Sequence, residues 1–153
     1  MSRAIRLHSF GGPEVPRLED VRIAAPGKGE VRIRQTAVGL NFIDVYGRTG
    51  LYPMPLPAGL GMEAAGVIVA TGPGVKDLKE GDRVAYVHSV PGAYADDRVL
   101  PADRVVKVPD GVDDRHAAAA MLKGLTAWYL LRRTYRVKKG DPVVIHAAAG
   151  GVG

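Results

Sequence analysis

The residues best suited to chemistry form a glycine-rich loop, Ala148–Gly153, directly after the short apolar run Pro142–Ile145. This order, a strand and then a glycine loop, is typical of dinucleotide-binding folds. In those folds the backbone N–H groups and positive dipole end of the following helix hold the pyrophosphate. Ala148, Gly150 and Gly153 occupy the three small-residue positions of the fingerprint, with alanine replacing the first glycine. A glycine loop alone also marks any tight turn, so the preceding strand is what favours nucleotide binding.

Most other catalytic schemes lack the residues they need. The absence of cysteine excludes disulfides, thiolate nucleophiles and cysteine-bound zinc. No serine lies in a Gly-x-Ser-x-Gly elbow, so a hydrolase triad is not expected. The adjacent carboxylates Asp96–Asp97 and Asp113–Asp114 project apart in a strand or helix and form no acid/base pair. The histidines show no metal-ligand spacing, and we expect no metal site.

The composition, 46% apolar and 24% charged, is that of a globular protein. The lack of cysteine and of any long apolar stretch predicts a cytoplasmic protein that does not contact a membrane. Much of the net charge of +5 is local, in Arg132, Arg133, Arg136, Lys138 and Lys139. This cluster is typical of a solvated surface at the end of a helix, where positive charges complement the negative end of the helix dipole. Contact with phosphate or RNA is the alternative.

Up to about Val108 the apolar residues alternate in short pieces broken by glycine and proline, which predicts a β-rich barrel or sandwich. Alternation gives one buried face to the strand that contains Ile5 and Leu7 and to the strand that contains Val31 and Ile33. A uniformly apolar segment predicts a strand buried on both faces. That segment is Ala65–Val69, and the other expected strands are Asp82–Val87, Ala93–Ala95 and Val105–Val108.

After residue 111 the period changes to that of helices. Asp113 or Asp114 can cap a helix through His116–Met121, and a second helix is expected from Thr126 to Arg133. On the helical period Leu122, Leu125 and Tyr129 share one face, so Tyr129 is core as readily as ligand. The change of pattern predicts that a β domain gives way to an α/β domain between residues 109 and 125.

Several long motifs in one order resemble the zinc-independent, zeta-crystallin-like quinone oxidoreductases of the medium-chain dehydrogenase/reductase superfamily. The motifs are Gly11–Val15, Val38–Asp44, Gly50–Pro53, Gly59–Val67, Lys123–Thr126 and His146–Gly153. Zinc-using relatives carry cysteine where Asn41 stands and histidine where Met62 stands. The resemblance therefore implies chemistry without a metal.

The resemblance implies a fold and a domain division. Residues 1–121 would form a mostly β, GroES-like partial barrel with short helices, which normally needs a returning carboxyl-terminal segment for completion. Residues 122–153 would supply a hinge helix and the first strand and glycine loop of a truncated Rossmann domain. We expect the chain to be the front part of a longer enzyme that forms a homodimer when complete.

The implied reaction is the reduction of a quinone by NADPH, with NADH the less favoured cofactor, through metal-free hydride or electron transfer. By resemblance, Asn41, Tyr46 and Tyr52 would line the quinone pocket and could donate hydrogen bonds to the oxygen that gains charge. The implied cofactor residues are Asn41, Phe42, Ile43, Asp44, Tyr46, Lys123, Thr126, Tyr129, Gly150, Gly151, Val152 and Gly153.

Each of these side chains also has an ordinary explanation. Asn41 can cap a helix that starts at Phe42, where Asp44 would stabilise the first turn, and Tyr46 can simply pack. Lys123 can be a solvated lysine, and His146 is interpreted as a hydrogen-bonded structural residue rather than an acid catalyst. Two other functions remain open: an enoyl or enone reductase of the same superfamily, and a non-catalytic RNA-binding protein.

Overall fold

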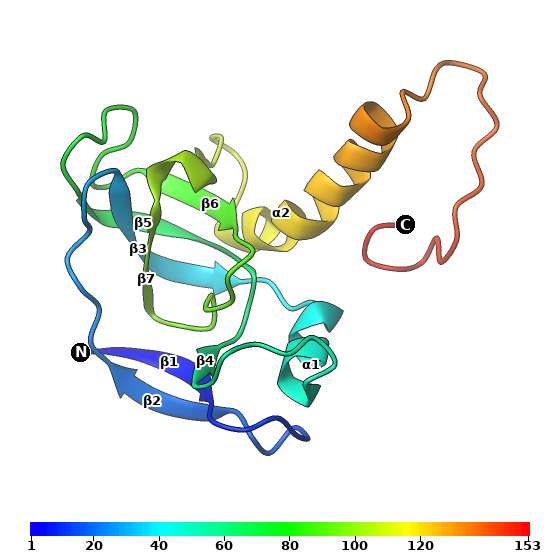
Figure 1. The fold of residues 1–153 in the computed structure, drawn as a ribbon. Helices are drawn as coiled ribbons and strands as arrows, with labels where there is room; N and C mark the ends of the chain where they lie inside the picture. The colour runs from blue at the N-terminus through cyan, green and yellow to red at the C-terminus, as the bar shows by residue number, and fades with distance from the viewer.

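The computed structural model describes all residues from 1 to 153 and places two antiparallel β-sheets side by side (Figure 1). The smaller sheet has the order β2-β1-β4, and the larger has the order β7-β3-β5-β6-β8. The strands are β1 (Ser2–Leu7), β2 (Arg17–Val21), β3 (Glu30–Val38), β4 (Ala58–Gly59), β5 (Glu63–Thr71), β6 (Arg83–Val87), β7 (Asp97–Pro101) and β8 (Val105–Lys107). The expected mostly β fold is confirmed.

Helices are few. Helix α1 (Phe42–Thr49) follows β3, a single 3-10 turn (Ala102–Arg104) precedes β8, and α2 (Asp114–Tyr129) continues into a π-helical turn (Leu130–Thr134). Helix α2 packs against β5, β3 and β6 at its start and then projects away from the sheets (Figure 1). No helix is long and apolar enough to cross a membrane.

The core lies on the larger sheet. Val31, Ile33, Ile68 and Tyr86 belong to one buried cluster built on β3, β5 and β6. The start of the central strand β5 is buried on both faces, as its uniformly apolar sequence predicts. A second buried cluster consists of three alanines, one each from β5, β6 and α2, which are Ala65, Ala85 and Ala118. These small side chains let the helix lie close against the sheet.

One strand prediction and one prediction of buried alternation are wrong. Ala93–Ala95 forms only an isolated bridge between Ala4 and Ala95, while the unpredicted strand β7 lies two residues later. The reason is tertiary, because β7 gains its hydrogen bonds from β3, with Arg32 opposite Val99. In β1 the buried residues are Ser2, Ala4 and Leu7, and Ile5 is only half-buried, so the expected alternation does not hold there.

The predicted pair of helices is one helix. Asp113 caps it as expected, since its Oδ1 accepts a hydrogen bond from the backbone N–H of His116 at 2.8 Å. Gly124 interrupts neither the backbone path nor the hydrogen bonding, and the Thr126 hydroxyl donates to the Leu122 carbonyl at 2.7 Å across that point. A lone glycine weakens a helix without ending it.

The predicted strand at residues 142–145 is also wrong. The segment is irregular and exposed, and Val144 is 84% accessible to solvent. A strand of a parallel sheet receives its hydrogen bonds from neighbouring strands, and no other strand lies beside this segment. The glycine loop that follows forms turns rather than the start of a helix.

Candidate functional site

The candidate site is built around Asn41, which immediately precedes α1 in an extended conformation. Only 8% of Asn41 is exposed. Its side-chain amide donates a hydrogen bond to Oε1 of Glu63 at 2.7 Å. The expected helix start is confirmed, and the Asn41 carboxamide is held by a residue that lies 22 positions later in the chain.

Glu63, at the start of β5, is completely buried and links three elements. Its Oε1 accepts from Asn41, and its Oε2 accepts from the backbone N–H of Leu122 in α2 at 2.5 Å. The N–H of Gly39 donates to the Glu63 carbonyl at 3.0 Å, and a Cβ at position 39 would overlap the Glu63 side chain. One carboxylate therefore fixes α2 relative to the start of α1.

Asp44 stabilises the first turn of α1, as predicted, and has an additional partner. Its Oδ2 accepts from the backbone N–H of Asn41 at 3.0 Å and from the hydroxyl of Tyr94 at 2.7 Å. Burial raises the pKa of Tyr94, and the hydrogen bond to the Asp44 carboxylate raises that pKa further. Tyr94 therefore stays a protonated donor at neutral pH.

An aromatic wall lies on the outer side of α1. The ring of Tyr46 meets the ring of Tyr52 edge-on, with 5.5 Å between centroids, and lies 6.0 Å from the ring of Phe42. Tyr52 is 55% exposed and Phe42 is 76% exposed. A cavity of about 240 Å³, which Ile43 and Tyr52 help to line, adjoins this wall. Of the predicted pocket residues, Tyr46 and Tyr52 meet in this wall and Tyr52 lines the cavity, whereas Asn41 lies just before α1 and contacts Glu63.

Lys123 connects the α1 region to the glycine loop. Its Nζ donates to the Leu40 carbonyl at 3.2 Å, next to Asn41. Its aliphatic stem lies so close to Gly151 that a Cβ there would be 2.8 Å from Lys123 Cε. The structure therefore gathers Lys123 and the loop residues Gly150, Gly151 and Gly153 at one end of the site, with Val152 exposed beside them.

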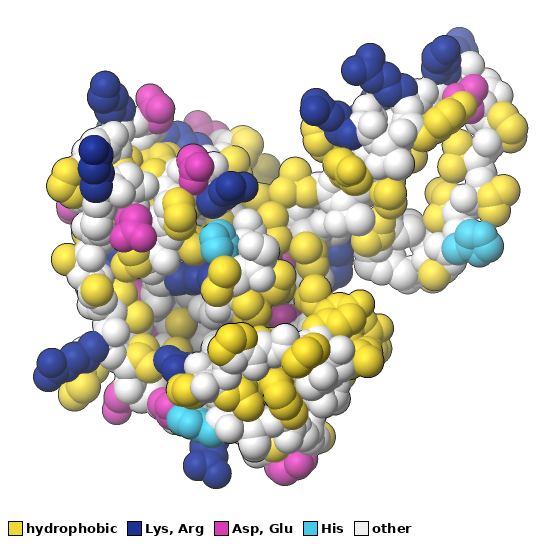
Figure 2. Space-filling view, viewed as in Figure 1, with side chains coloured by type: hydrophobic (Ala, Val, Ile, Leu, Met, Phe, Trp, Pro, Cys, Tyr) yellow, Lys and Arg dark blue, Asp and Glu magenta, His cyan; other side chains and the backbone are white.

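Other predicted residues lie outside this arrangement. The Thr126 hydroxyl is occupied by its own helix, and Tyr129 is 57% exposed rather than part of a core. His146 is exposed, with no side-chain hydrogen bond, so its interpretation as a hydrogen-bonded structural residue is wrong for this structure. The basic residues 132–139 are exposed around the end of α2, where Arg133 stacks over Trp128 (Figure 2).

Sequence reasoning missed Glu63 and Tyr94. A signal for Glu63 was present, because a carboxylate that directly precedes a uniformly apolar strand is drawn into the interior and needs donors there. Tyr94 gave no such signal, since it belongs to a segment that was predicted as a strand. No group of three or more histidine, aspartate or glutamate side chains is arranged to hold a metal ion.

Comparison with known proteins identifies the family. Residues 27–110 match the alcohol dehydrogenase GroES-like domain. The chain belongs to this GroES-like family. Over its whole length this GroES-like chain is 53% identical to a quinone oxidoreductase of Pseudomonas aeruginosa, of which it covers 47%. It is 48% identical to the 2-haloacrylate reductase of a Burkholderia species, again over the whole chain and 48% of that protein.

Solved structures show the same similarity to quinone oxidoreductases. The GroES-like chain superposes on the crystal structure of Escherichia coli quinone oxidoreductase complexed with NADPH, with a TM-score of 0.85 and 47% identity. The match covers 90% of this chain and 42% of that one. The likeness to quinone oxidoreductases that the sequence motifs predicted is confirmed. The chain spans about half the length of the curated relatives it matches.

Proposed function

We propose that the whole protein reduces quinones with NADPH, without a metal ion. The observation that carries this proposal is the buried Asn41 carboxamide, oriented by Glu63 beside an aromatic wall and close to a lysine from α2. The similarity of this chain to quinone oxidoreductases, one of which was solved in complex with NADPH, also supports the proposal.

The residues present fit a dinucleotide at the glycine loop. A Cβ at Gly150 would lie 2.9 Å from the Ala147 carbonyl, and one at Gly153 would overlap that carbonyl, so this turn has room only for glycine. Such a turn lets backbone N–H groups approach a pyrophosphate closely. Lys123 adds positive charge next to Gly151, where it would attract the phosphates.

When bound, NADPH supplies a hydride, which carries two electrons. The overall conversion would be quinone, NADPH and one proton to hydroquinone and NADP⁺, and this chain's part in it would be to bind and orient the two reactants. Asn41 retains one amide N–H that is not used by Glu63, and the hydroxyl of Tyr52 is also available as a donor. Both can stabilise the charge that develops on a quinone oxygen, while the aromatic wall offers rings on which a flat acceptor can be oriented.

The donor set at positions 41 and 62 supports the metal-free form of the proposal. An amide and a thioether stand there, whereas zinc in proteins is held by thiolate, imidazole or carboxylate groups. We also propose the division at residues 121/122, a cytoplasmic setting and a homodimer for the whole protein, as the resemblance implies. Light scattering of the full-length protein tests the dimer.

An enone or enoyl reductase is the second candidate, favoured by the 48% identity to a 2-haloacrylate reductase. Its acceptor would be a conjugated carbon–carbon double bond rather than a quinone, with hydride transfer from the same cofactor. The ratio of kcat/KM values for a benzoquinone and for a crotonyl thioester separates the two candidates. A larger value for the thioester would overturn the quinone assignment.

The first test is NADPH binding, measured by nicotinamide fluorescence on this chain and on the full-length gene product. Binding by the full-length protein supports the proposal, and absence of binding there overturns it in favour of a non-catalytic role. For that role, RNA affinity should weaken steeply with salt and disappear on charge reversal at Arg132 and Arg133.

The second test concerns the site. Asn41→Ala should lower kcat/KM for a quinone about 100-fold, as expected for loss of an oriented donor. Tyr52→Phe should lower it about 10-fold, and Tyr135→Phe is the matched control because Tyr135 is similarly exposed, at 64%. Equal rates for the Tyr52 and Tyr135 variants would contradict the assigned role of Tyr52.

A further inference from the structure

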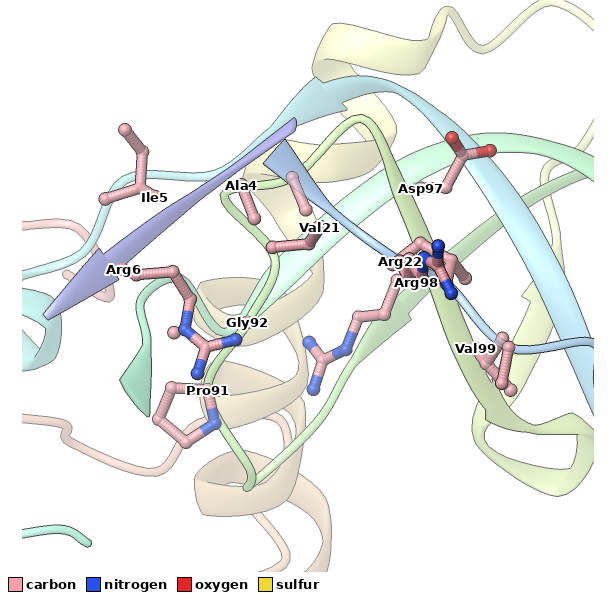
Figure 3. A pocket seen from close by; sticks show the side chains of 14 residues that line it. Ala4, Ile5, Arg6, Val21, Arg22, Pro91, Gly92, Asp97, Arg98 and Val99 are labelled. Atoms are coloured by element: carbon pink, nitrogen blue, oxygen red, sulfur yellow. The ribbon is translucent and has the colours of Figure 1, made fainter. Parts of the chain in front are cut away.

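A second cavity lies between the two sheets, and no residue of α1 or α2 lines it. It has a volume of about 300 Å³ and is lined by β1, the segment after β2, the end of β4, the 91–95 loop and β7 (Figure 3). Three arginines line it, Arg6 from β1, Arg22 after β2 and Arg98 from β7. None of these arginines belongs to the site assigned above.

The arginines of this cavity are not neutralised. No carboxylate lies within 4.0 Å of Arg6, Arg22 or Arg98, although eight ion pairs occur elsewhere in the structure. The one acid in the lining, Asp97, is nearly buried and faces Arg32 at 3.4 Å and Arg34 at 3.6 Å. Oδ1 of Asp97 is buried without a hydrogen bond, but the Asp97 charge is balanced by these two arginines, so the lining carries a net positive charge.

Two of the guanidinium groups are held in place by neutral acceptors. Arg98 donates to the Val90 carbonyl at 2.5 Å, and its Cζ lies 5.3 Å from the centre of the Tyr86 ring. Arg6 donates through one terminal nitrogen to the Pro57 carbonyl at 3.3 Å. These contacts fix both side chains before any ligand arrives, which reduces the entropy lost on binding.

One donor in the lining lacks a partner. The Nε of Arg6 is buried and makes no hydrogen bond. A buried donor without an acceptor is costly, so Arg6 gains more from an added acceptor than a fully solvated arginine does. In Figure 3, Arg6 and Arg98 reach from two sides toward the Pro91–Gly92 segment, and an ideal Cβ on Gly92 would be 3.6 Å from Arg98 Cζ.

We propose that this cavity binds a small organic carboxylate between Arg6 and Arg98. A guanidinium group presents paired N–H donors in a planar fork that matches a carboxylate. The rest of the lining is largely apolar, with Ile5, Val21 and Val99 beside the arginines. A carboxylate head with a short apolar body therefore complements the cavity better than a fully hydrated anion. This inference does not depend on the reductase function.

Calorimetry on the full-length protein tests the site with sodium hexanoate as the probe. Hexanoate should bind, and hexanamide, which has the same body without charge, should bind at least about 10-fold more weakly. Inorganic phosphate should also bind at least about 10-fold more weakly, because it leaves the apolar lining unused. Equal affinity for phosphate would overturn the organic ligand, and no binding of hexanoate would overturn the site.

Variants locate the binding. Arg6→Gln should weaken hexanoate binding at least about 10-fold. Arg104→Gln, which makes the same change of charge at a side chain 65% exposed outside the cavity, should leave it unchanged. Arg98 also holds the 90–92 loop in place, so substituting it could disturb that loop. The participation of Arg98 is therefore measured in the unsubstituted protein, from the ¹⁵N side-chain resonances of Arg6 and Arg98. Both Nε signals should shift on addition of hexanoate, and unmoved signals would contradict the proposal.

Discussion

The buried contact between Asn41 and Glu63 allows a quantitative test of how the site is held together. Glu63→Gln removes the buried charge that accepts from both Asn41 and the Leu122 N–H, and its new NH₂ group pairs with Asn41 only if the Asn41 carboxamide turns its oxygen toward it. Hydrogen bonds to charged groups contribute about 1.5–3 kcal/mol, and water cannot replace the lost acceptor at a completely buried position. We expect the free energy of unfolding to fall by about 2 kcal/mol.

Asn41→Asp is the complementary change, because it places a second carboxylate against Glu63. Two like charges at hydrogen-bond distance in a buried site should cost about 3 kcal/mol or more. The double variant exchanges the two groups, because the new amide at position 63 can donate to the new carboxylate at position 41 while its carbonyl accepts from the Leu122 N–H. The double-mutant cycle should therefore give a coupling energy of about 2 kcal/mol or more in favour of the pair.

Urea unfolding followed by circular dichroism measures all four proteins. Glu19→Gln serves as the control, because Glu19 pairs with His8 at the surface and should change stability by no more than about 0.5 kcal/mol. If Glu63→Gln behaves like this control, or if the double variant is no more stable than the sum of the single changes, Glu63 is not the link between α1 and α2.

Three further predictions concern the surroundings of the site and the start of α2. Tyr94→Phe removes one of two hydrogen bonds to the carboxylate in the first turn of α1 and should cost about 1–2 kcal/mol in urea unfolding, whereas an unchanged midpoint would exclude that contact. Hydrogen bonds from Thr36 and Arg83 lower the pKa of Asp114, so its stabilisation is complete above its unfolded pKa of about 3.9 and is lost as the pH falls through the lower folded value. Asp114→Asn should therefore flatten the loss of stability below about pH 4, and a carboxyl NMR titration at or above the ordinary pKa would contradict this. Gly39→Ala should destabilise the protein by about 1–3 kcal/mol, because the new Cβ would overlap the buried Glu63 side chain. A melting temperature equal to that of the parent would show that the Glu63 side chain moves aside at no cost.

Local patterns in the sequence determined a good part of this structure. The alternation of Val31 and Ile33, the apolar run at 65–69 and the capping aspartate at 113 each predict an element that the structure contains. These signals work because a strand face or a helix cap depends on residues only a few positions apart. The ordered motifs likewise predicted the likeness to quinone oxidoreductases, since such matches need no knowledge of contacts.

The tertiary structure alone decided which segments meet. Strand β7 exists because β3 lies beside it, while residues 142–145 have a strand-like sequence and no neighbouring strand. The same holds for the site, where Asn41 could be identified from its motif but its hydrogen bond to Glu63 could not be predicted. Propensity is set within a few residues, whereas a buried carboxylate or an edge strand is stabilised only by donors that the folded chain brings from far away.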